Sequence, residues 1–374
     1  MKGPVAVYVH IPFCPSKCGY CDFNSYAMDG DIVERTTQAI EREILKSPHA
    51  GRPAKTVFFG GGTPTFLTAE QIGRILSTVM QVHPPAGHIE ITSEANPGTV
   101  DASKFADMRQ AGFNRISLGG QSFDSHELRQ LGRVHQADEI VRAVKSARSG
   151  GFDNVSLDLM FALPGQSMES WQRNLDTAIS LGTDHLSLYC LTIEPNTRFY
   201  RLNLRGMLAL PNEDKQVKMY EAALSTCEAA GLQQYEISNF AKPGHQSQHN
   251  LCYWRAEEYL GYGPGAVGAF DTEAGRLRQT KIKHPERYCQ AVESGEPLAC
   301  EAETLSPADI NVERIMLGIR LNEGLSTKTI EIDEEGFATA LSRGWIAEVG
   351  DQIRLTEPGR HFGQDVAVLL APVA

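Results

Sequence analysis

Between residues 5 and 230 the sequence alternates six times between a short apolar or β-branched run and a longer amphipathic stretch. The strand-like runs lie at residues 5–11, 55–60, 88–95, 115–119, 154–161 and 185–193. The helix-like stretches lie at residues 32–46, 69–82, 103–111, 137–148, 168–181 and 213–230. Such alternation predicts a parallel sheet with right-handed crossovers. Six units are fewer than the eight of a closed barrel, so we expect an α/β fold built on an open, partial (β/α)6 barrel.

A chain of 374 residues has room for a second, smaller domain. We expect a barrel over residues 1–240, a connecting segment over 241–301 and a C-terminal domain over 302–374. In that last part, an apolar-periodic run at 310–321 and a short helix at 334–341 precede a hairpin at 345–355 that turns at Gly350 and Asp351. Helices followed by a small hairpin predict a winged-helix-like α+β module.

The formal charge of −11 argues against a protein that grips nucleic acid through phosphates. The N-terminus resembles no secretory signal, and eight mostly scattered cysteines suit a reducing compartment. The apolar run at 366–374 is too short to cross a bilayer. We therefore expect a cytoplasmic protein whose membrane contact, if it has one, is peripheral at the inner face of the membrane.

Three cysteines, Cys14, Cys18 and Cys21, follow the first strand in a C-x3-C-x2-C spacing. Soft thiolate ligands select iron–sulfur clusters, zinc or Cu(I). A cubane on three cysteines would keep one iron without a protein ligand, as catalytic metal sites keep an open position. The residues alone leave three other interpretations open: a disulfide, a zinc site with His10 as fourth ligand, and unrelated thiols.

The whole phrase, YVHIPFCPSKCGYCDF at residues 8–23, resembles the radical S-adenosylmethionine (SAM) superfamily. Within it, the wording is similar to the branch that contains the oxygen-independent coproporphyrinogen III oxidases and the haem chaperones of the HemW type. The resemblance implies a 4Fe-4S cluster on Cys14, Cys18 and Cys21, SAM on the open iron, and an external electron donor. It also implies reductive cleavage of SAM, and it supports the open barrel.

In parallel barrels the working residues lie just past the carboxyl ends of the strands. This chain has a GGGTP segment at residues 60–64, Glu94 after the third strand run, Gln121 after the fourth and Asp158 within the fifth. Taken alone, these residues also fit a tight turn, a solvated rim charge or, for Arg133, a surface arginine. The resemblance implies that SAM binds to Tyr8, Tyr20, Gly61, Gly62, Thr63, Glu94, Gln121, Arg133 and Asp158. Gly120 stands where the family usually has valine, which predicts looser packing behind Gln121.

A second motif, HNLCYW, begins at His249. A histidine beside a Tyr-Trp pair offers a nitrogen ligand and flat apolar surfaces for an iron porphyrin. A buried structural histidine with two core aromatics stays open from the residues alone. The resemblance to the haem chaperones implies haem binding by His249, Asn250, Tyr253 and Trp254, with Cys252 in the core. Further on, Val267 stands where relatives usually have histidine.

The oxidases generally carry a further cysteine two residues after the third ligand, where this chain has Phe23, and a longer segment before the loop. Our first hypothesis is therefore a haem chaperone that delivers haem to acceptor proteins, including membrane-associated respiratory ones. The second is a coproporphyrinogen III oxidase, and the third is a radical SAM enzyme that modifies haem. The position of the cysteine loop leaves a homodimer contact open.

Overall fold

The computed structural model describes residues 3–372. Residues 5–229 contain the six expected strand–helix units. The strands are β1 (Val5–Ile11), β2 (Ala54–Gly61), β3 (Pro85–Ala95), β4 (Arg115–Gln121), β5 (Asn154–Phe161) and β6 (His185–Cys190). The main helices are α1 (Asp31–Leu45), α2 (Ala69–Val82), α3 (Ala102–Ala111), α5 (Ala137–Ser149), α6 (Met168–Ser180) and α8 (Glu213–Ala229). Two short helices were not predicted, α4 (Ser125–Leu131) and α7 (Arg198–Leu204).

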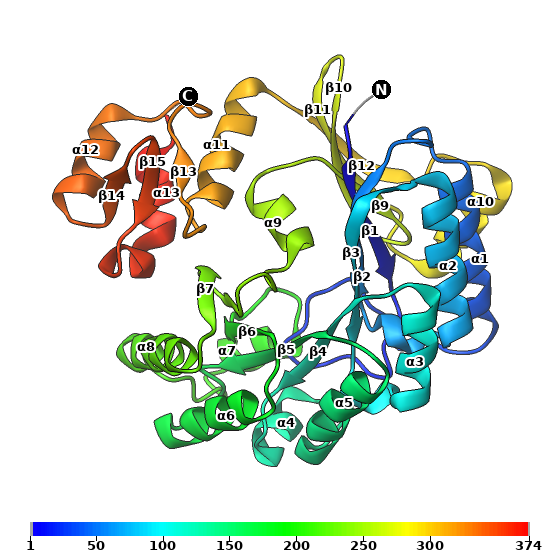
Figure 1. Cartoon of the computed structure of the whole chain (residues 1–374), viewed down its shortest axis with the longest axis horizontal. Helices are drawn as coiled ribbons and strands as arrows, with labels where there is room; N and C mark the ends of the chain where they lie inside the picture. Colours follow the sequence, from blue (N-terminus) through cyan, green and yellow to red (C-terminus); the bar gives the residue numbers. More distant parts are fainter. Residues whose placement is uncertain (1–2, 373–374) are drawn as a thin grey trace.

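Strands β1 to β6 are parallel and follow one another in the sheet, with helices packed around the outside (Figure 1). In β1 every side chain except that of Tyr8 is buried, as expected for a strand covered on both faces. In α2 the buried residues Ile72, Ile75, Leu76 and Val79 recur at helical spacing, and a Thr68–Gln71 capping box starts the helix. The α/β fold with an open barrel is confirmed.

The segment expected to connect two domains extends the same sheet. It contains α9 (Gln248–Trp254), β9 (Tyr259–Tyr262), β10 (Val267–Thr272), β11 (Gly275–Lys281), α10 (Pro285–Ser294) and the start of β12 (Ala299–Leu305). Strand β9 pairs in parallel with β1, and β10, β11 and β12 continue outward as antiparallel strands. At the other edge, β8 (Asn239–Ala241) and β7 (Gln233–Glu236) follow β6. Among residues 3–372 the sheet thus has twelve strands. It crosses the boundary predicted at residue 240, so the domain division stays a prediction.

The C-terminal part has its own small core. Its elements are α11 (Pro307–Gly318), β13 (Leu325–Ser326), α12 (Glu334–Ser342), β14 (Ile346–Val349), β15 (Gln352–Leu355) and α13 (Gly363–Leu370). The predicted hairpin is confirmed, because β14 and β15 are antiparallel and are joined at residues 350–351. Ile315, Ile346, Ile353 and Val366 are buried together. The fully buried Glu236 carboxylate accepts from Arg320, 2.8 Å away, and so ties this core to the barrel.

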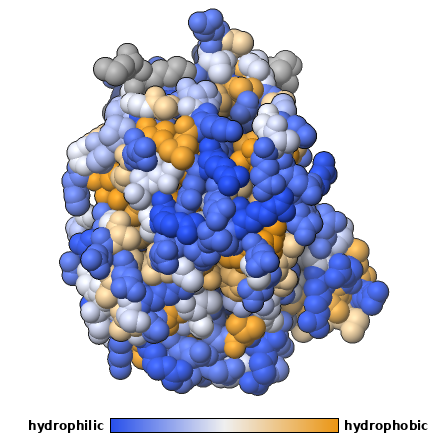
Figure 2. All heavy atoms as spheres, turned by 90° about the vertical axis from the view of Figure 1, so that its right-hand side faces the viewer, coloured by the Kyte–Doolittle hydropathy of each residue, from blue (hydrophilic) through white to orange (hydrophobic). Residues whose placement is uncertain are grey.

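The face that carries α1, α2 and α10 is mostly polar, with apolar side chains in separate patches (Figure 2). Among the described residues, no helix combines the length and the apolar character needed to span a bilayer.

Candidate functional site

One pocket at the carboxyl ends of the parallel strands gathers nearly all the residues predicted for the cluster and for SAM. It has a volume of about 130 Å³. Its walls include Cys14, Cys18, Tyr20, Cys21, Gly61, Gly62, Thr63, Glu94, Gln121, Arg133 and Asp158. Tyr8 is the exception, since it lines two neighbouring cavities. The fold therefore brings together side chains that the sequence spreads over about 150 residues.

The cysteine loop is fixed at both ends by backbone hydrogen bonds. Cys14 N–H donates to Tyr26 O (3.0 Å) and Tyr26 N–H donates to Pro12 O (2.7 Å). In the middle, Gly19 N–H donates to Leu131 O, 3.0 Å away at the end of α4. All three cysteines are free and partly exposed. The loop therefore has a defined path, and its thiols are accessible from the pocket.

The surroundings of the sulfur atoms fit a thiolate-held cluster. The Cys14 Sγ lies 3.5 Å from the Thr63 hydroxyl, and Arg133 Nη1 lies 3.7 Å from Cys18 Sγ. Hydrogen-bond donors and a cation both stabilise thiolates. Burial raises the pKa of the Cys21 thiol, which a bound metal would offset because metal binding releases the thiol proton. Within residues 3–372 no three His, Cys, Asp or Glu side chains already converge as a metal site, so we carry the cluster forward as a proposal.

His10 does not have a free nitrogen for a metal. Its Nδ1 lies 3.0 Å from the Tyr8 hydroxyl and its Nε2 lies 2.8 Å from Asn24 O. Burial lowers the pKa of His10 to about 4, so the ring is neutral. His10 is thus a structural side chain beneath the loop, and it leaves the alternative of a zinc site without its fourth ligand.

The glycines of the GGGTP segment are explained by close packing. Gly61 has a φ of 110°, and a Cβ there would lie 2.5 Å from the His10 ring. A Cβ on Gly62 would lie 2.5 Å from Phe13 O. The N–H groups of Gly61, Gly62 and Thr63 donate to Glu94, Ile11 and Phe13, respectively. The Gly62 and Thr63 N–H groups therefore hold the end of β2 against β1 and the start of the cysteine loop, and the Gly61 N–H holds the Glu94 side chain of β3.

Two carboxyl groups in the pocket, those of Glu94 and Asp158, are half-buried. Burial, and secondarily the charge of Asp158, raise the pKa of Glu94 to about 8. Burial also raises the pKa of Asp158, whose Oδ1 accepts from the Ser117 hydroxyl at 3.0 Å. A cationic ligand would stabilise both groups in their charged form. SAM carries an ammonium and a sulfonium group, so the residues present fit it.

Gln121 and Arg133 approach the pocket from the end of β4 and the loop after α4. Gln121 has a φ of 67°, a left-handed conformation that is uncommon outside glycine and is often found at functional sites. Arg133 is half-buried, donates to Gly119 O at 2.6 Å, and has an Nε without a hydrogen-bond partner among the described residues. The packing behind Gln121 is filled, because a Cβ on Gly120 would lie 2.8 Å from Leu157 Cδ1.

The HNLCYW motif forms α9, which lies between the parallel strands and α11 (Figure 1). His249 is fully buried, with its ring stacked on Phe58 at 5.0 Å. Its Nδ1 is 2.8 Å from the Thr56 hydroxyl and its Nε2 is 2.9 Å from the Tyr253 hydroxyl. Burial lowers the pKa of His249 to about 3. Iron ligation by Nε2 would require the Tyr253 hydroxyl to move, so haem binding here stays a prediction. Cys252 is buried in the core, as expected.

Two cavities adjoin the pocket and α9. A cleft of about 590 Å³ is lined by Tyr8, Phe23, Glu94, Tyr253 and Trp254, and Val267 also lines it. A cavity of about 300 Å³ inside the barrel shares Tyr8, Glu94 and Tyr253 with that cleft. Both volumes are in the range of small-molecule sites. Phe23, which replaces the further cysteine of the oxidases, is 61% exposed and borders both the cleft and the cysteine pocket.

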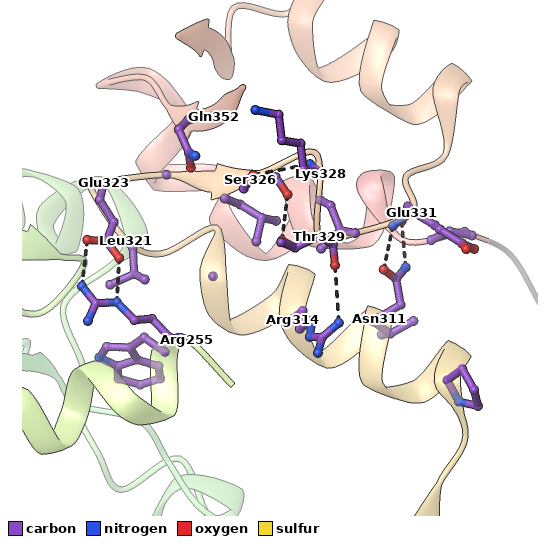
Figure 3. A pocket seen from close by; sticks show the side chains of 18 of the residues that line it. Arg255, Asn311, Arg314, Leu321, Glu323, Ser326, Lys328, Thr329, Glu331 and Gln352 are labelled. Atoms are coloured by element: carbon purple, nitrogen blue, oxygen red, sulfur yellow. Dashed lines mark hydrogen bonds and ion pairs between the residues drawn. The ribbon is translucent and has the colours of Figure 1, made fainter. Parts of the chain in front are cut away.

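A larger groove of about 1280 Å³ is lined by the end of α9, by α11 and by part of the segment from residue 321 to residue 331 (Figure 3). Trp254 is the sole predicted site residue that lines it. Several of its polar side chains already have protein partners: Arg255 holds Glu323 through two nitrogens at 2.8 and 2.9 Å, and Asn311 pairs with the backbone of Glu331. Its size therefore reflects the junction between two cores, and the residues predicted for the cluster and for SAM line the smaller pocket instead.

The sequence analysis did not identify Arg115, Ser187 or Tyr189, which line the interior cavity. It also did not identify Thr56 and Phe58, which hold His249. For Arg115 the sequence did contain a signal, because it begins a strand that is buried on both faces, and a buried arginine is rarely found without a partner. The others look like ordinary strand residues.

Comparison with known proteins gives three findings. The family model "Radical SAM superfamily" matches residues 8–178. The chain is 40% identical to "Heme chaperone HemW" of Bacillus subtilis over 375 residues, which cover 96% of this chain and 97% of that protein. It is 40% identical to the protein of that name in Escherichia coli, with 96% of each chain covered. The solved structure of coproporphyrinogen III oxidase (HemN) from Escherichia coli superposes with a TM-score of 0.84 at 23% identity, covering 99% of this chain and 90% of that one.

Proposed function

Because this chain belongs to the HemW family of radical SAM proteins, we propose that it is a haem chaperone, which binds haem and delivers it to haem-requiring acceptor proteins. The observation that carries the proposal is the 40% identity to proteins named as haem chaperones along nearly the whole of both chains. The likeness to the oxidase structure, at 23% identity, supports the fold alone. Phe23 in place of a further cysteine also favours the chaperone.

Membership in the superfamily implies SAM and an iron–sulfur cluster. We propose that Cys14, Cys18 and Cys21 hold a 4Fe-4S cluster. When bound, the cluster and SAM would supply electron transfer and cleavage of a carbon–sulfur bond. Of the protein's own groups, Arg133 would stabilise the Cys18 thiolate, and Glu94 and Asp158 would attract the cationic ligand. Tyr20, Gln121 and the GGGTP segment would enclose it.

For haem, we propose the cleft beside α9. Tyr253 and Trp254 offer flat apolar surfaces, and His249 lies directly behind Tyr253. His249 would become an iron ligand when the Tyr253 hydroxyl releases its Nε2. We further propose that the acceptors include membrane-associated respiratory proteins and that an external donor reduces the cluster. We also propose that the protein forms a homodimer and is located in the cytoplasm near the membrane.

The experiment uses protein prepared and reconstituted without oxygen. Haem is titrated into the wild-type protein and into two variants, His249→Ala and His126→Ala, and the Soret band is followed. His126 is exposed on α4 and serves as the matched control. We expect one haem per chain in the wild type and in the control, and at least a tenfold weaker affinity in His249→Ala.

A second arm tests the alternative function. The same protein is incubated with coproporphyrinogen III, SAM and a reductant. A chaperone forms no protoporphyrinogen. Efficient conversion would replace the proposal with the oxidase, and a wild-type protein that takes up no haem would remove the haem chaperone altogether.

A further inference from the structure

We propose that the cavity inside the barrel receives a carboxylate of the bound haem, with Arg115 as its anion-binding residue. The inference rests on the proposed haem binding and adds to it the orientation of the ligand. The carboxylate-bearing edge of the macrocycle would enter the barrel, and the opposite edge would stay in the cleft beside α9.

The first observation is a buried arginine whose guanidinium has only one distant ion-pair partner among the described residues. Arg115 is the first residue of β4, and its side chain is 2% exposed. Within residues 3–372 its Nε has no hydrogen-bond partner. Its ion-pair partner, Glu90, lies 3.9 Å from Nε, which is beyond hydrogen-bond distance. A buried charge is unfavourable unless it is paired and hydrogen-bonded, so this guanidinium has unused binding capacity.

Glu90 is engaged elsewhere, which explains the loose pair. Its two carboxylate oxygens accept the backbone N–H groups of Gln248 and His249, each at 3.0 Å. These are the first residues of α9, where a carboxylate is favoured by the free N–H groups and the helix dipole. Glu90 therefore holds the helix that carries the haem motif and leaves the Arg115 guanidinium free for another anion.

The second observation is the cavity itself. Arg115 lines the space of about 300 Å³ together with Ser117, Ser187, Tyr189 and Asn250. The Ser117 and Ser187 hydroxyls bond to Asp158, so the Tyr189 phenol and the Asn250 amide are the groups in this set that can donate a hydrogen bond to a carboxylate oxygen of the ligand. Asn250 belongs to the motif predicted to bind haem, so two independent lines, the motif and the buried arginine, meet in one cavity.

The third observation is charge separation within the cavity. Glu94 and Asp158 also line it, but their hydrogen bonds run to Gly61 N–H and to the Ser117 hydroxyl. These two groups belong to the pocket proposed for SAM, on the side away from Arg115 along the strands. The cavity is thus acidic toward the SAM pocket and cationic toward the start of β4.

Together these features select a ligand class. A guanidinium binds a carboxylate through two parallel hydrogen bonds, which a neutral ester cannot accept with the same strength. The cleft offers aromatic walls from Tyr253, Trp254 and Tyr259, which suit a flat apolar macrocycle. Tyr8, Glu94 and Tyr253 line both spaces, so the cleft and the cavity are adjacent, and a ligand that displaces one of these side chains would extend from one into the other.

The test compares haem with haem dimethyl ester, whose two carboxylates are blocked, in the same detergent buffer. We expect the wild-type protein to bind the ester at least about tenfold more weakly than haem. Arg115→Met should bind the two ligands about equally, and Arg115→Lys should retain part of the difference. Arg52→Met is the matched control, because Arg52 is also buried but is paired with Glu258 outside the cavity.

Equal affinities of the wild-type protein for haem and its ester would overturn the inference while leaving the haem chaperone intact, and this arm needs no variant to fold. A wild-type protein that binds neither ligand would instead contradict the proposed function. SAM affinity is measured in parallel, since SAM also carries a carboxylate. If Arg115→Met weakened SAM binding tenfold and kept the preference for haem over its ester, the carboxylate at Arg115 would be that of SAM and the inference would be wrong.

Discussion

The cysteine pocket and the HNLCYW helix both carry residues that the sequence assigns to cofactors, yet the structure prepares them differently. In the pocket, side chains from several strands face a common space, Arg133 Nε has no hydrogen-bond partner among residues 3–372, and burial raises the pKa of Glu94 and Asp158. In α9, both nitrogens of His249 are hydrogen-bonded and the ring is fully buried. The first region is preorganised for a ligand, whereas the second must rearrange before it can bind one.

The largest expected effect comes from removing one of the three cysteines of the preorganised region. Cys18→Ser should abolish the cluster and reduce SAM cleavage by at least about a hundredfold, because the remaining two thiolates cannot hold a cubane. Iron and sulfide content after anaerobic reconstitution checks this, with the exposed Cys300→Ser as control. Full iron content in Cys18→Ser would contradict the cluster site.

The buried carboxyl of Glu94 gives a pH prediction for the ligand-free protein. Its pKa of about 8 lies above the value of about 4.3 expected in the unfolded chain, so the folded state binds the extra proton. The contribution of Glu94 to the free energy of unfolding is fully present below about pH 4. It is lost as the pH rises through 8, and the loss is at most about 5 kcal/mol. Urea unfolding between pH 5 and 9 measures it.

Glu94→Gln removes this titrating group and should flatten the pH dependence of the unfolding free energy. Glu70, which is exposed on α2, provides the control Glu70→Gln. If the free energy of unfolding of Glu94→Gln fell with pH as steeply as that of the wild type, the pH dependence would not come from the ionisation of Glu94.

Gly120 tests how tightly the preorganised region is packed. Leu157 and Ile140 occupy the space of a side chain at this position, since their nearest carbons lie 2.8 and 3.2 Å from the point that a Cβ would take. Gly120→Val should therefore lower the free energy of unfolding by about 1–3 kcal/mol. Denaturant unfolding checks this, and a double variant with Leu157→Ala should recover part of the loss. A stabilised Gly120→Val would mean that the strand is looser than the structure indicates.

The smallest effect should appear in the region that has to rearrange. Tyr253→Phe removes the hydroxyl that engages His249 Nε2 but keeps the ring. Haem affinity should rise a few-fold, because one hydrogen bond no longer has to break before the iron is bound. Haem titration measures this, and Tyr259→Phe, on the same cleft, is the control. Weaker haem binding by Tyr253→Phe would indicate that the hydroxyl itself contacts the ligand.

The sequence was sufficient to predict the parallel strands and the residues at their carboxyl ends, because periodic apolar runs and strand-end motifs are local signals. It could not predict β9, which pairs with β1 across about 250 residues and so leaves no local trace. Nor could it show that the Gly61 and Gly62 N–H groups bond within the protein, or that Thr56 and Tyr253 engage His249. Those facts depend on which side chains meet in space.

The parallel pairing of β9 with β1 also orders events during biosynthesis. The Asn24 side chain, within the cysteine loop, donates to Pro264 O and Lys283 O, each at 3.0 Å, so the loop is braced by a segment made some 240 residues later. The bonds of the loop to Pro12, Tyr26 and Leu131 can form while the first six strand–helix units are being made. The bonds of Asn24 can be completed only when about three quarters of the polypeptide has been synthesised, because Lys283 is residue 283 of 374.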